Sequence, residues 1–158
     1  MISVKHLFES LNQSKKIGIV GYSAMKFDED LAKKLINEGL DNVDAKEGDE
    51  LVSGLTDLGI PGLAYRIGKE RNMKLIGIAC EKAHDEDSVC YPVDREIIVG
   101  KNWGDESKTF LDYIDVLIKV GGGKQSKEEY EKFDGPKINF ELESKWGNYY
   151  ERFRFSTW

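Results

Sequence analysis

Residues 115–126 read DVLIKVGGGKQS, an apolar run that stops at three successive glycines. The apolar residues are continuous rather than alternating, which indicates a strand buried on both faces of a sheet. The segment KQSKEEYEKF, which begins at Lys124, is rich in strong helix formers. We therefore predict a strand, a glycine-rich loop and a helix in succession, the repeating unit of parallel sheets.

The same succession recurs along the chain. Residues 16–22, KIGIVGY, predict a first buried strand. The helix that follows is expected to be capped by Asp28 or Asp30 and to end at Gly39. Further strands are expected at 50–53, 74–80 and 95–99, and further helices around 63–68 and over 107–114. Strands that alternate with helices predict an α/β fold, a Rossmann-like, doubly wound and mainly parallel sheet with helices on both faces.

Length and composition favour a single globular domain over residues 1–158, because 158 residues and 18.0 kDa match the usual size of one domain. With 40% hydrophobic and 33% charged residues, the chain is too apolar for disorder and too charged for a membrane protein. A net charge of −6 disfavours nucleic acid as a partner. Without a signal-peptide pattern or a long apolar span, we expect a cytoplasmic protein that does not contact the membrane.

Three loops at predicted carboxyl ends of strands are rich in small residues, and that end of a parallel sheet is where ligands bind. Small residues let the main chain approach a ligand, and the amides at a following helix start attract anions. We therefore predict phosphate binding, and no bound metal, at Gly21, Tyr22, Ser23, Ala24, Ser53, Gly54, Asp57, Gly59, Gly121, Gly122, Gly123, Lys124, Gln125 and Ser126.

Two familiar nucleotide motifs are missing from the sequence. The first strand is not followed by GxGxxG, and Gly123-Lys124 lacks both the earlier glycine and the Ser or Thr of a P-loop. Ordinary dinucleotide dehydrogenases and P-loop NTPases are therefore disfavoured.

The segments IVGYSA, LVSGLTDLGIPGLAYRIGKERN, KLIGIA and YIDVLIKVGGGKQSKEEY resemble the LOG-like Rossmann group, or SLOG superfamily, over roughly residues 15–133. This group includes cytokinin-activating phosphoribohydrolases, molybdenum cofactor carrier proteins and nucleotide-sensing modules. In the family motif PGGxGTxxE, Gly121 takes the proline position, Gln125 the last glycine and Ser126 the threonine. Glu129 falls on the motif's glutamate.

The resemblance implies a role for Glu129 in catalysis or in ribose binding. The alternative is a solvated helix residue among Glu128, Glu131 and Lys132, because charge runs on helices usually face water. The family hydrolases also use an arginine one helix earlier, where this chain reads WGDESKTF with Lys108 as its only cation. Lys108 is therefore the candidate second catalytic group, but lysine lacks the planar fork of arginine. We lean towards a protein that is not an enzyme.

The resulting prediction is the binding of a nucleotide or another phosphate-bearing ligand. No cofactor is required, although a bound nucleotide or pterin fits the prediction. The alternatives are a nucleoside 5′-monophosphate phosphoribohydrolase, a molybdenum cofactor carrier, and an interaction module without a small ligand. The resemblance also implies a homo-oligomer, a dimer or a tetramer.

We expect the remaining polar and aromatic clusters to serve the fold or its assembly rather than chemistry. The spacing of Cys80, His84 and Cys90 matches no standard zinc pattern, and neither a disulfide nor a catalytic thiol is expected. Trp103 is expected to pack beneath the neighbouring helix rather than to stack on a ligand. The aromatic-rich extension at about 136–158 should form an added strand and helix, or a dimer interface.

Overall fold

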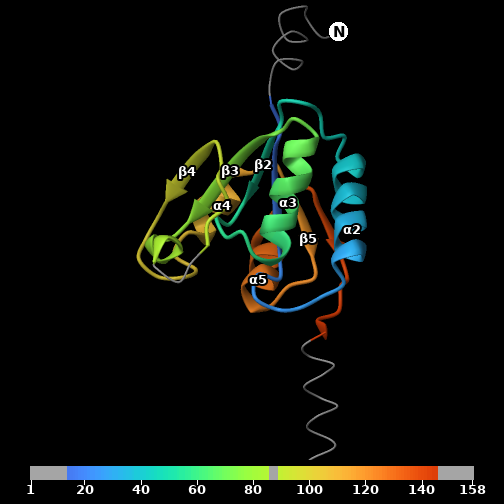
Figure 1. Ribbon diagram of the computed structural model, residues 1–158. Coiled ribbons are helices and arrows are strands. Elements are labelled where there is room, and N and C mark those ends of the chain that lie inside the picture. The colour runs from blue at the N-terminus through green and yellow to red at the C-terminus, as the bar shows by residue number, and fades with distance from the viewer. Residues whose placement is uncertain (1–13, 86–88, 146–158) are drawn as a thin grey trace, which may run out of the picture.

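Six parallel strands form one sheet in the order β4-β3-β2-β1-β5-β6 (Figure 1). The structure is a computed structural model that describes residues 14–85 and 89–145. The strands are β1 (Lys16–Gly21), β2 (Glu50–Ser53), β3 (Lys74–Ala79), β4 (Arg95–Ile98), β5 (Val116–Val120) and β6 (Lys137–Phe140). The first five match the predicted strands to within two residues at either end.

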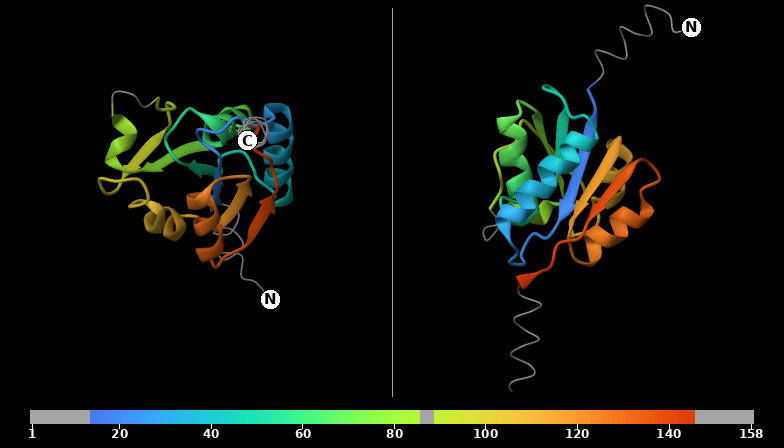
Figure 2. Two further views of the ribbon diagram at one scale, coloured as in Figure 1. Left: turned by 90° about the horizontal axis from the view of Figure 1, so that it is seen from below. Right: turned by 90° about the vertical axis from the view of Figure 1, so that its right-hand side faces the viewer.

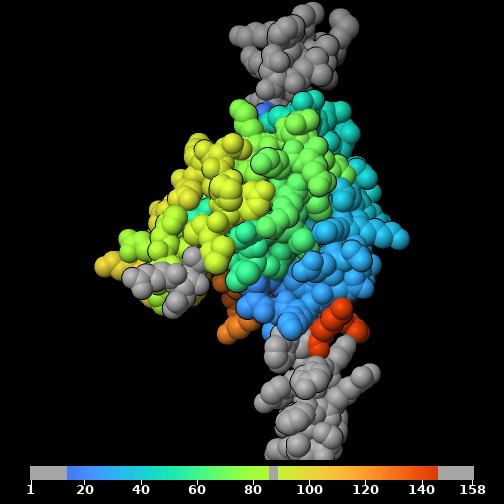
Figure 3. Space-filling model, viewed as in Figure 1, coloured from blue at the N-terminus to red at the C-terminus, as the bar shows by residue number. Residues whose placement is uncertain are grey.

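Helices cover both faces of this sheet, as Figure 2 shows. On one face lie α2 (Glu29–Asn42) and α3 (Gly59–Glu70), whose side chains form a continuous surface in Figure 3. On the other face lie α4 (Ser107–Tyr113) and α5 (Lys124–Lys132), and a short 3-10 helix, η1 (Glu81–His84), follows β3. Each face has its own hydrophobic core. The predicted α/β, doubly wound fold is confirmed.

The helix α2 begins as predicted but ends later. Its N-cap is Asp28, whose carboxylate accepts a hydrogen bond of 3.1 Å from the Leu31 amide. The predicted stop at Gly39 is wrong, because the helix continues to Asn42. Gly39 is a packing residue instead, since a Cβ atom there would lie 2.9 Å from Cγ2 of Ile118. The glycine lets α2 lie close to β5.

The amino end of the sheet is fastened by aspartates that precede strands. Asp49 is buried and accepts hydrogen bonds from the amides of Lys15, at 2.9 Å, and Lys46, at 2.8 Å. Asp94 accepts from the Leu75 amide at 2.7 Å, and Asp115 accepts from the Lys16 amide at 2.9 Å. Side chains thereby satisfy backbone donors that would otherwise lack a partner at this edge.

The beginning of the aromatic extension adds the parallel strand β6 beside β5, which agrees with the predicted added strand. Beyond β6, Leu142 is buried in the same core as α2, and the Lys145 amide donates a 2.7 Å hydrogen bond to the Lys26 carbonyl. The predicted helix and the alternative dimer interface fall on residues 146–158, outside the described residues.

The two outer strands are short and carry charged side chains. On β4, Arg95 and Glu96 are exposed, and on β6 Lys137 is exposed. Among the helices in the described part of the chain, none is long and apolar enough to span a lipid bilayer.

Candidate functional site

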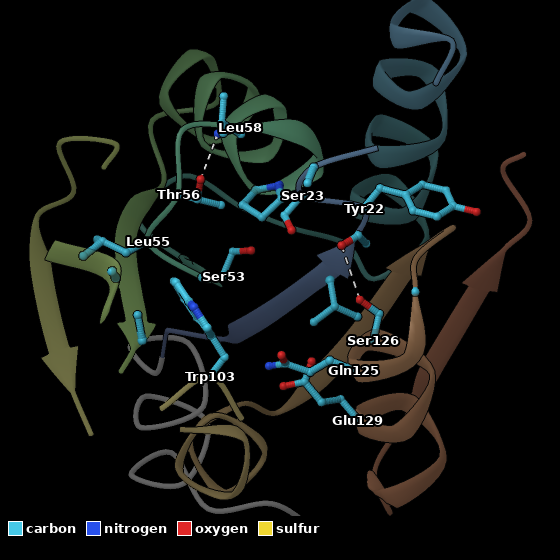
Figure 4. Close-up of a pocket in the computed structure, with 18 of the residues that line it drawn as sticks. Tyr22, Ser23, Ser53, Leu55, Thr56, Leu58, Trp103, Gln125, Ser126 and Glu129 are labelled. Atoms are coloured by element: carbon cyan, nitrogen blue, oxygen red, sulfur yellow. Dashed lines mark hydrogen bonds between the residues drawn. The ribbon is translucent and has the colours of Figure 1, made fainter. Parts of the chain in front are cut away.

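The strand order brings the three predicted loops together. Strands β1 to β4 follow one another towards one side of the sheet, whereas β5 and β6 lie on the other side of β1. The carboxyl ends of β2, β1 and β5 are therefore adjacent, at the position where the direction of winding reverses and where open α/β sheets bind ligands. The loops after these three strands line one cavity of about 580 Å³ (Figure 4). This volume is within the usual range for small-molecule sites.

Most of the predicted site residues line this cavity. From the first two loops these are Gly21, Tyr22, Ser23, Ala24, Ser53 and Gly54, and from the third loop and α5 they are Gly123, Lys124, Gln125, Ser126 and Glu129. The lining does not include Asp57, Gly59, Gly121, Gly122 or Lys108.

Two of the glycines outside the lining hold the loops close together. Gly59 has a φ of 64°, and a Cβ atom there would lie 2.2 Å from the Tyr22 carbonyl oxygen. Gly121 has a φ of 61°, and its Cβ atom would lie 2.5 Å from the ring of Tyr22. Any other residue at these positions would push the loops apart. Asp57 has a separate role, since Oδ1 lies 2.8 Å from Nη1 of Arg66.

The structure does not bring Lys108 to the cavity. Its side chain is 87% exposed, and Nζ lies 2.7 Å from Oδ2 of Asp112, one helical turn away. The hydrogen bond to Asp112 raises the pKa of the lysine. The pairing of Lys108 with Glu129 that the resemblance implies is therefore not observed.

The polar side of the cavity is the first turn of α5. The first hydrogen bond of this helix runs from the Lys127 amide to the Gly123 carbonyl, at 3.1 Å. The amides of residues 124–126 precede that bond and form the positive end of the helix dipole. The Ser126 hydroxyl makes only a long hydrogen bond of 3.3 Å, to the Gly21 carbonyl. These groups are suited to the oxygens of a phosphate.

Glu129 is a buried carboxyl group on the same helix, and it lines the cavity from below in Figure 4. Burial raises its pKa to about 7, against a partial lowering by the Ser107 hydroxyl, which donates a 3.0 Å hydrogen bond. Glu106, also buried, raises the pKa of Glu129 further by its charge. A carboxyl group with such a pKa can hold or release a proton near neutrality.

Sequence reasoning missed Glu106 and Ser107, although both lie in the quoted segment WGDESKTF. Nε2 of Gln125 donates to Oε1 of Glu106 at 3.1 Å and lies 3.4 Å from the Ser107 hydroxyl. Glu106, Gln125, Ser107 and Glu129 thus form one hydrogen-bonded network between α4 and α5. The sequence does show two polar residues at the start of a predicted helix. That pattern is typical of a helix N-cap, so it does not by itself indicate a binding site.

The second loop is supported from beneath by a tyrosine that sequence reasoning also missed. Tyr65 is fully buried, and its hydroxyl lies 2.8 Å from the Gly54 carbonyl and 2.9 Å from the Ile76 carbonyl. Burial strongly raises its pKa, so the hydroxyl remains a donor. The Ser53 side chain links two strands of the sheet, because its hydroxyl donates a 2.6 Å hydrogen bond to the Ile19 carbonyl. No local pattern distinguishes Tyr65 from an ordinary core residue.

The other side of the cavity is apolar, and it contains the one aromatic residue whose role was predicted wrongly. Trp103 is 56% exposed and lines the cavity instead of packing beneath a helix. The cause is the local turn: Asp105 accepts hydrogen bonds from the amides of Lys101 and Asn102, and Gly100 and Gly104 have positive φ angles. This turn places Trp103 away from the core.

The two cysteines are free thiols. Cys80 is fully buried at the end of β3. The Cys90 thiol donates to the Ala83 carbonyl at 2.9 Å, and burial raises its pKa. His84 lies 3.8 Å from Cys90 Sγ and 2.8 Å from Glu96. Within residues 14–85 and 89–145, no group of three or more His, Cys, Asp or Glu side chains could hold a metal ion.

Comparison with known proteins identifies the fold. No family model matches the sequence, and no curated protein is similar to it at a significant level. Among solved structures, the molybdenum cofactor carrier protein of Chlamydomonas reinhardtii is 22% identical with a TM-score of 0.63, over 92% of this chain and 85% of that one. The molybdenum cofactor binding protein of the phototrophic bacterium Rippkaea orientalis is 19% identical with a TM-score of 0.60, over the same shares of the two chains. The chain therefore has the fold of the molybdenum cofactor carrier proteins, which are one member of the group that its motifs resemble.

Proposed function

We propose that this protein binds a nucleotide or a nucleotide-like, phosphate-bearing ligand at the carboxyl end of its sheet. The observation that carries the proposal is the meeting of the three small-residue loops around one cavity at the β1–β5 switch point. The phosphate would lie at the first turn of α5, where helix amides and the Ser126 hydroxyl converge and Lys124 adds a positive charge at the mouth.

Native mass spectrometry of freshly purified protein tests this proposal. We expect an added mass in the range of a nucleotide or a pterin phosphate, which is lost when the protein is denatured. The same spectrum reports the number of subunits and so tests the predicted dimer or tetramer. In parallel, calorimetric titration with AMP, ribose 5-phosphate and inorganic phosphate should detect binding. A protein that carries no ligand and binds none of the three would be an interaction module instead.

A second candidate function is the hydrolysis of the N-glycosidic bond of a nucleoside 5′-monophosphate, and Glu129 favours it. Its buried carboxyl group, with a pKa near 7, lies beside the proposed phosphate site and could exchange a proton with the leaving base or with water. No arginine is among the described residues that line the cavity, so this part of the chain does not supply the guanidinium group that the resemblance gives to the hydrolases. Release of free adenine from AMP, and its loss in Glu129→Ala, would establish this activity.

A molybdenum cofactor carrier is the third candidate, and the two similar structures favour it. The chemistry of the cavity suits this cofactor, because hydrogen-bond donors for a phosphate lie opposite an apolar side that could cover a pterin ring. Gly123, Ser126 and the amides between them would hold the phosphate. Copurification of a pterin with the protein, detected by its absorbance, would support this function.

A cytoplasmic location of the protein stays a prediction of the sequence.

A further inference from the structure

The exposed apolar side chains of this protein are concentrated at the cavity. In the described part of the chain, six large hydrophobic residues are substantially exposed, and four of them line the cavity: Met25, Leu58, Val89 and Trp103. They come from four different loops, so one surface helix does not explain the cluster. Exposed apolar groups gathered around a concave site indicate that an apolar partner covers them.

Trp103 is the largest of these side chains, and the backbone of the turn that carries it is held by hydrogen bonds. The turn that carries it is held by Asp105, whose Oδ2 accepts hydrogen bonds from the amides of Lys101, at 3.0 Å, and Asn102, at 2.9 Å. The amide of Gly104 donates to Glu106 at 3.1 Å. The indole projects into the hollow towards Ser53 (Figure 4). Because the backbone of this turn is already ordered, only the side chain of Trp103 has to be ordered when a ligand binds against it.

The cavity is divided between an apolar and a polar side. Trp103 and Leu55 lie on the side of β2 and β3, and Ser126, Gln125 and Glu129 lie across the hollow on α5 (Figure 4). A ligand that fills both sides needs a flat apolar part joined to an anionic part. A phosphate alone would leave the apolar side uncovered, and an apolar molecule alone would leave the helix amides without a partner.

We infer that Trp103 stacks on a planar nitrogen heterocycle, such as a purine or a pterin, whose attached phosphate occupies the first turn of α5. Leu58, Met25 and Val89 enclose the edge of the ring. This inference rests on the proposed function and narrows it: ligands with both a ring and a phosphate are preferred to phosphorylated sugars. Stacking on an aromatic side chain tolerates different rings, so both classes of heterocycle remain suitable.

The test compares ligands with and without the ring. AMP and neopterin monophosphate carry both parts, whereas ribose 5-phosphate lacks the heterocycle. In the unaltered protein we expect the ring-bearing ligands to bind roughly tenfold or more tightly than ribose 5-phosphate, as stacking on one aromatic residue predicts. Trp103→Ala should remove that advantage and leave ribose 5-phosphate affinity within about twofold. Trp103→Phe should retain most of it, because phenylalanine also has a ring face.

Leu31→Ala is the matched control, because Leu31 is an exposed apolar residue of α2 outside the cavity lining. It should change no affinity. Equal affinities for AMP, neopterin monophosphate and ribose 5-phosphate, unaffected by Trp103→Ala, would overturn the stacking inference while supporting the phosphate site. Failure of all three ligands to bind would overturn the proposed function and the inference with it. A preference for AMP or for neopterin monophosphate that depends on Trp103 supports the inference and identifies the heterocycle.

Discussion

The two ends of the sheet satisfy their backbone donors in opposite ways. At the amino end, Asp49, Asp94 and Asp115 accept hydrogen bonds from the amides of neighbouring segments. At the carboxyl end, the loops carry glycine and serine, and the amides at the start of α5 face a cavity. A carboxylate from the chain closes the first end, and the second end is the one at which we propose that an anion from outside binds. On this proposal, the difference separates residues that maintain the fold from residues that bind the ligand.

The largest expected effect comes from the closed end. Asp49→Ala removes the acceptor of two amide hydrogen bonds at a buried position, and should lower the free energy of unfolding by about 3 kcal/mol. Urea denaturation measures this loss. Asp112→Ala, at an exposed ion pair, is the control and should change stability by less than about 0.5 kcal/mol. If Asp49→Ala abolished ligand binding in protein that is still folded, the proposed separation of roles would be wrong.

The next effect tests the open end through pH. Because the pKa of Glu129 is raised from 4.5 to about 7, the folded protein keeps a proton there that the unfolded chain releases. The carboxyl group therefore reduces stability progressively as the pH rises from about 4.5 to about 7. Glu129→Gln removes this dependence, and its stability relative to the unaltered protein should increase across that interval by about 3 kcal/mol, the full difference being reached by pH 8.

Thermal unfolding at a series of pH values measures this difference, and Glu128→Gln, on the same helix but more exposed, serves as its control. A constant difference between Glu129→Gln and the unaltered protein over the whole range would show that the carboxyl group titrates normally. Phosphate binding should also weaken less above pH 7 in Glu129→Gln than in the unaltered protein, since the ionised carboxylate repels the ligand.

A smaller effect is expected for the hydroxyl at the proposed phosphate site. Ser126→Ala should weaken the binding of ribose 5-phosphate about fivefold, which is the usual value of one hydrogen bond, and should change stability little. Calorimetric titration of ribose 5-phosphate into the unaltered protein and into Ser126→Ala measures the two affinities. Thr56→Ala is the matched control, because this hydroxyl also lines the cavity but accepts the Leu58 amide at 3.2 Å within its own turn. Equal losses in the two variants would show that phosphate does not contact Ser126.

The smallest effect is expected for Lys108. Because its ammonium group pairs with Asp112 and does not line the cavity, Lys108→Ala should change ligand affinity, and any release of base from AMP, by less than about twofold. A large loss would mean that the lysine leaves Asp112 and reaches the ligand when it binds.

The sequence predicted the strands and helices well because their patterns are local. Continuous apolar runs and the cap at Asp28 depend on neighbouring residues only. The strand order, which creates the site, has no such local signal, because all six strands have the same direction and similar composition. Gly39 was wrongly predicted to end a helix because its actual role is not local either. It makes room for Ile118, a residue far away in the chain.

The residues of the candidate site show the same division between local and long-range signals. Loops after strands were recognisable from glycine and serine, and the structure brings them together. Trp103, Glu106 and Tyr65 were misread or missed, because their roles depend on the direction in which a turn or helix presents them. Composition can identify a loop as suitable for phosphate, but it does not show which side chain forms the opposite wall of the cavity.

The charged outer strands have a consequence for assembly. An additional strand pairing with β4 would bring a second chain against the exposed Arg95 and Glu96 and would confine their side chains. On β6 it would meet Lys137 in the same way. Lateral growth of the sheet from one molecule to the next is therefore disfavoured at both borders. Copies of this chain that associate should do so through other surfaces, which leaves the sheet at six strands.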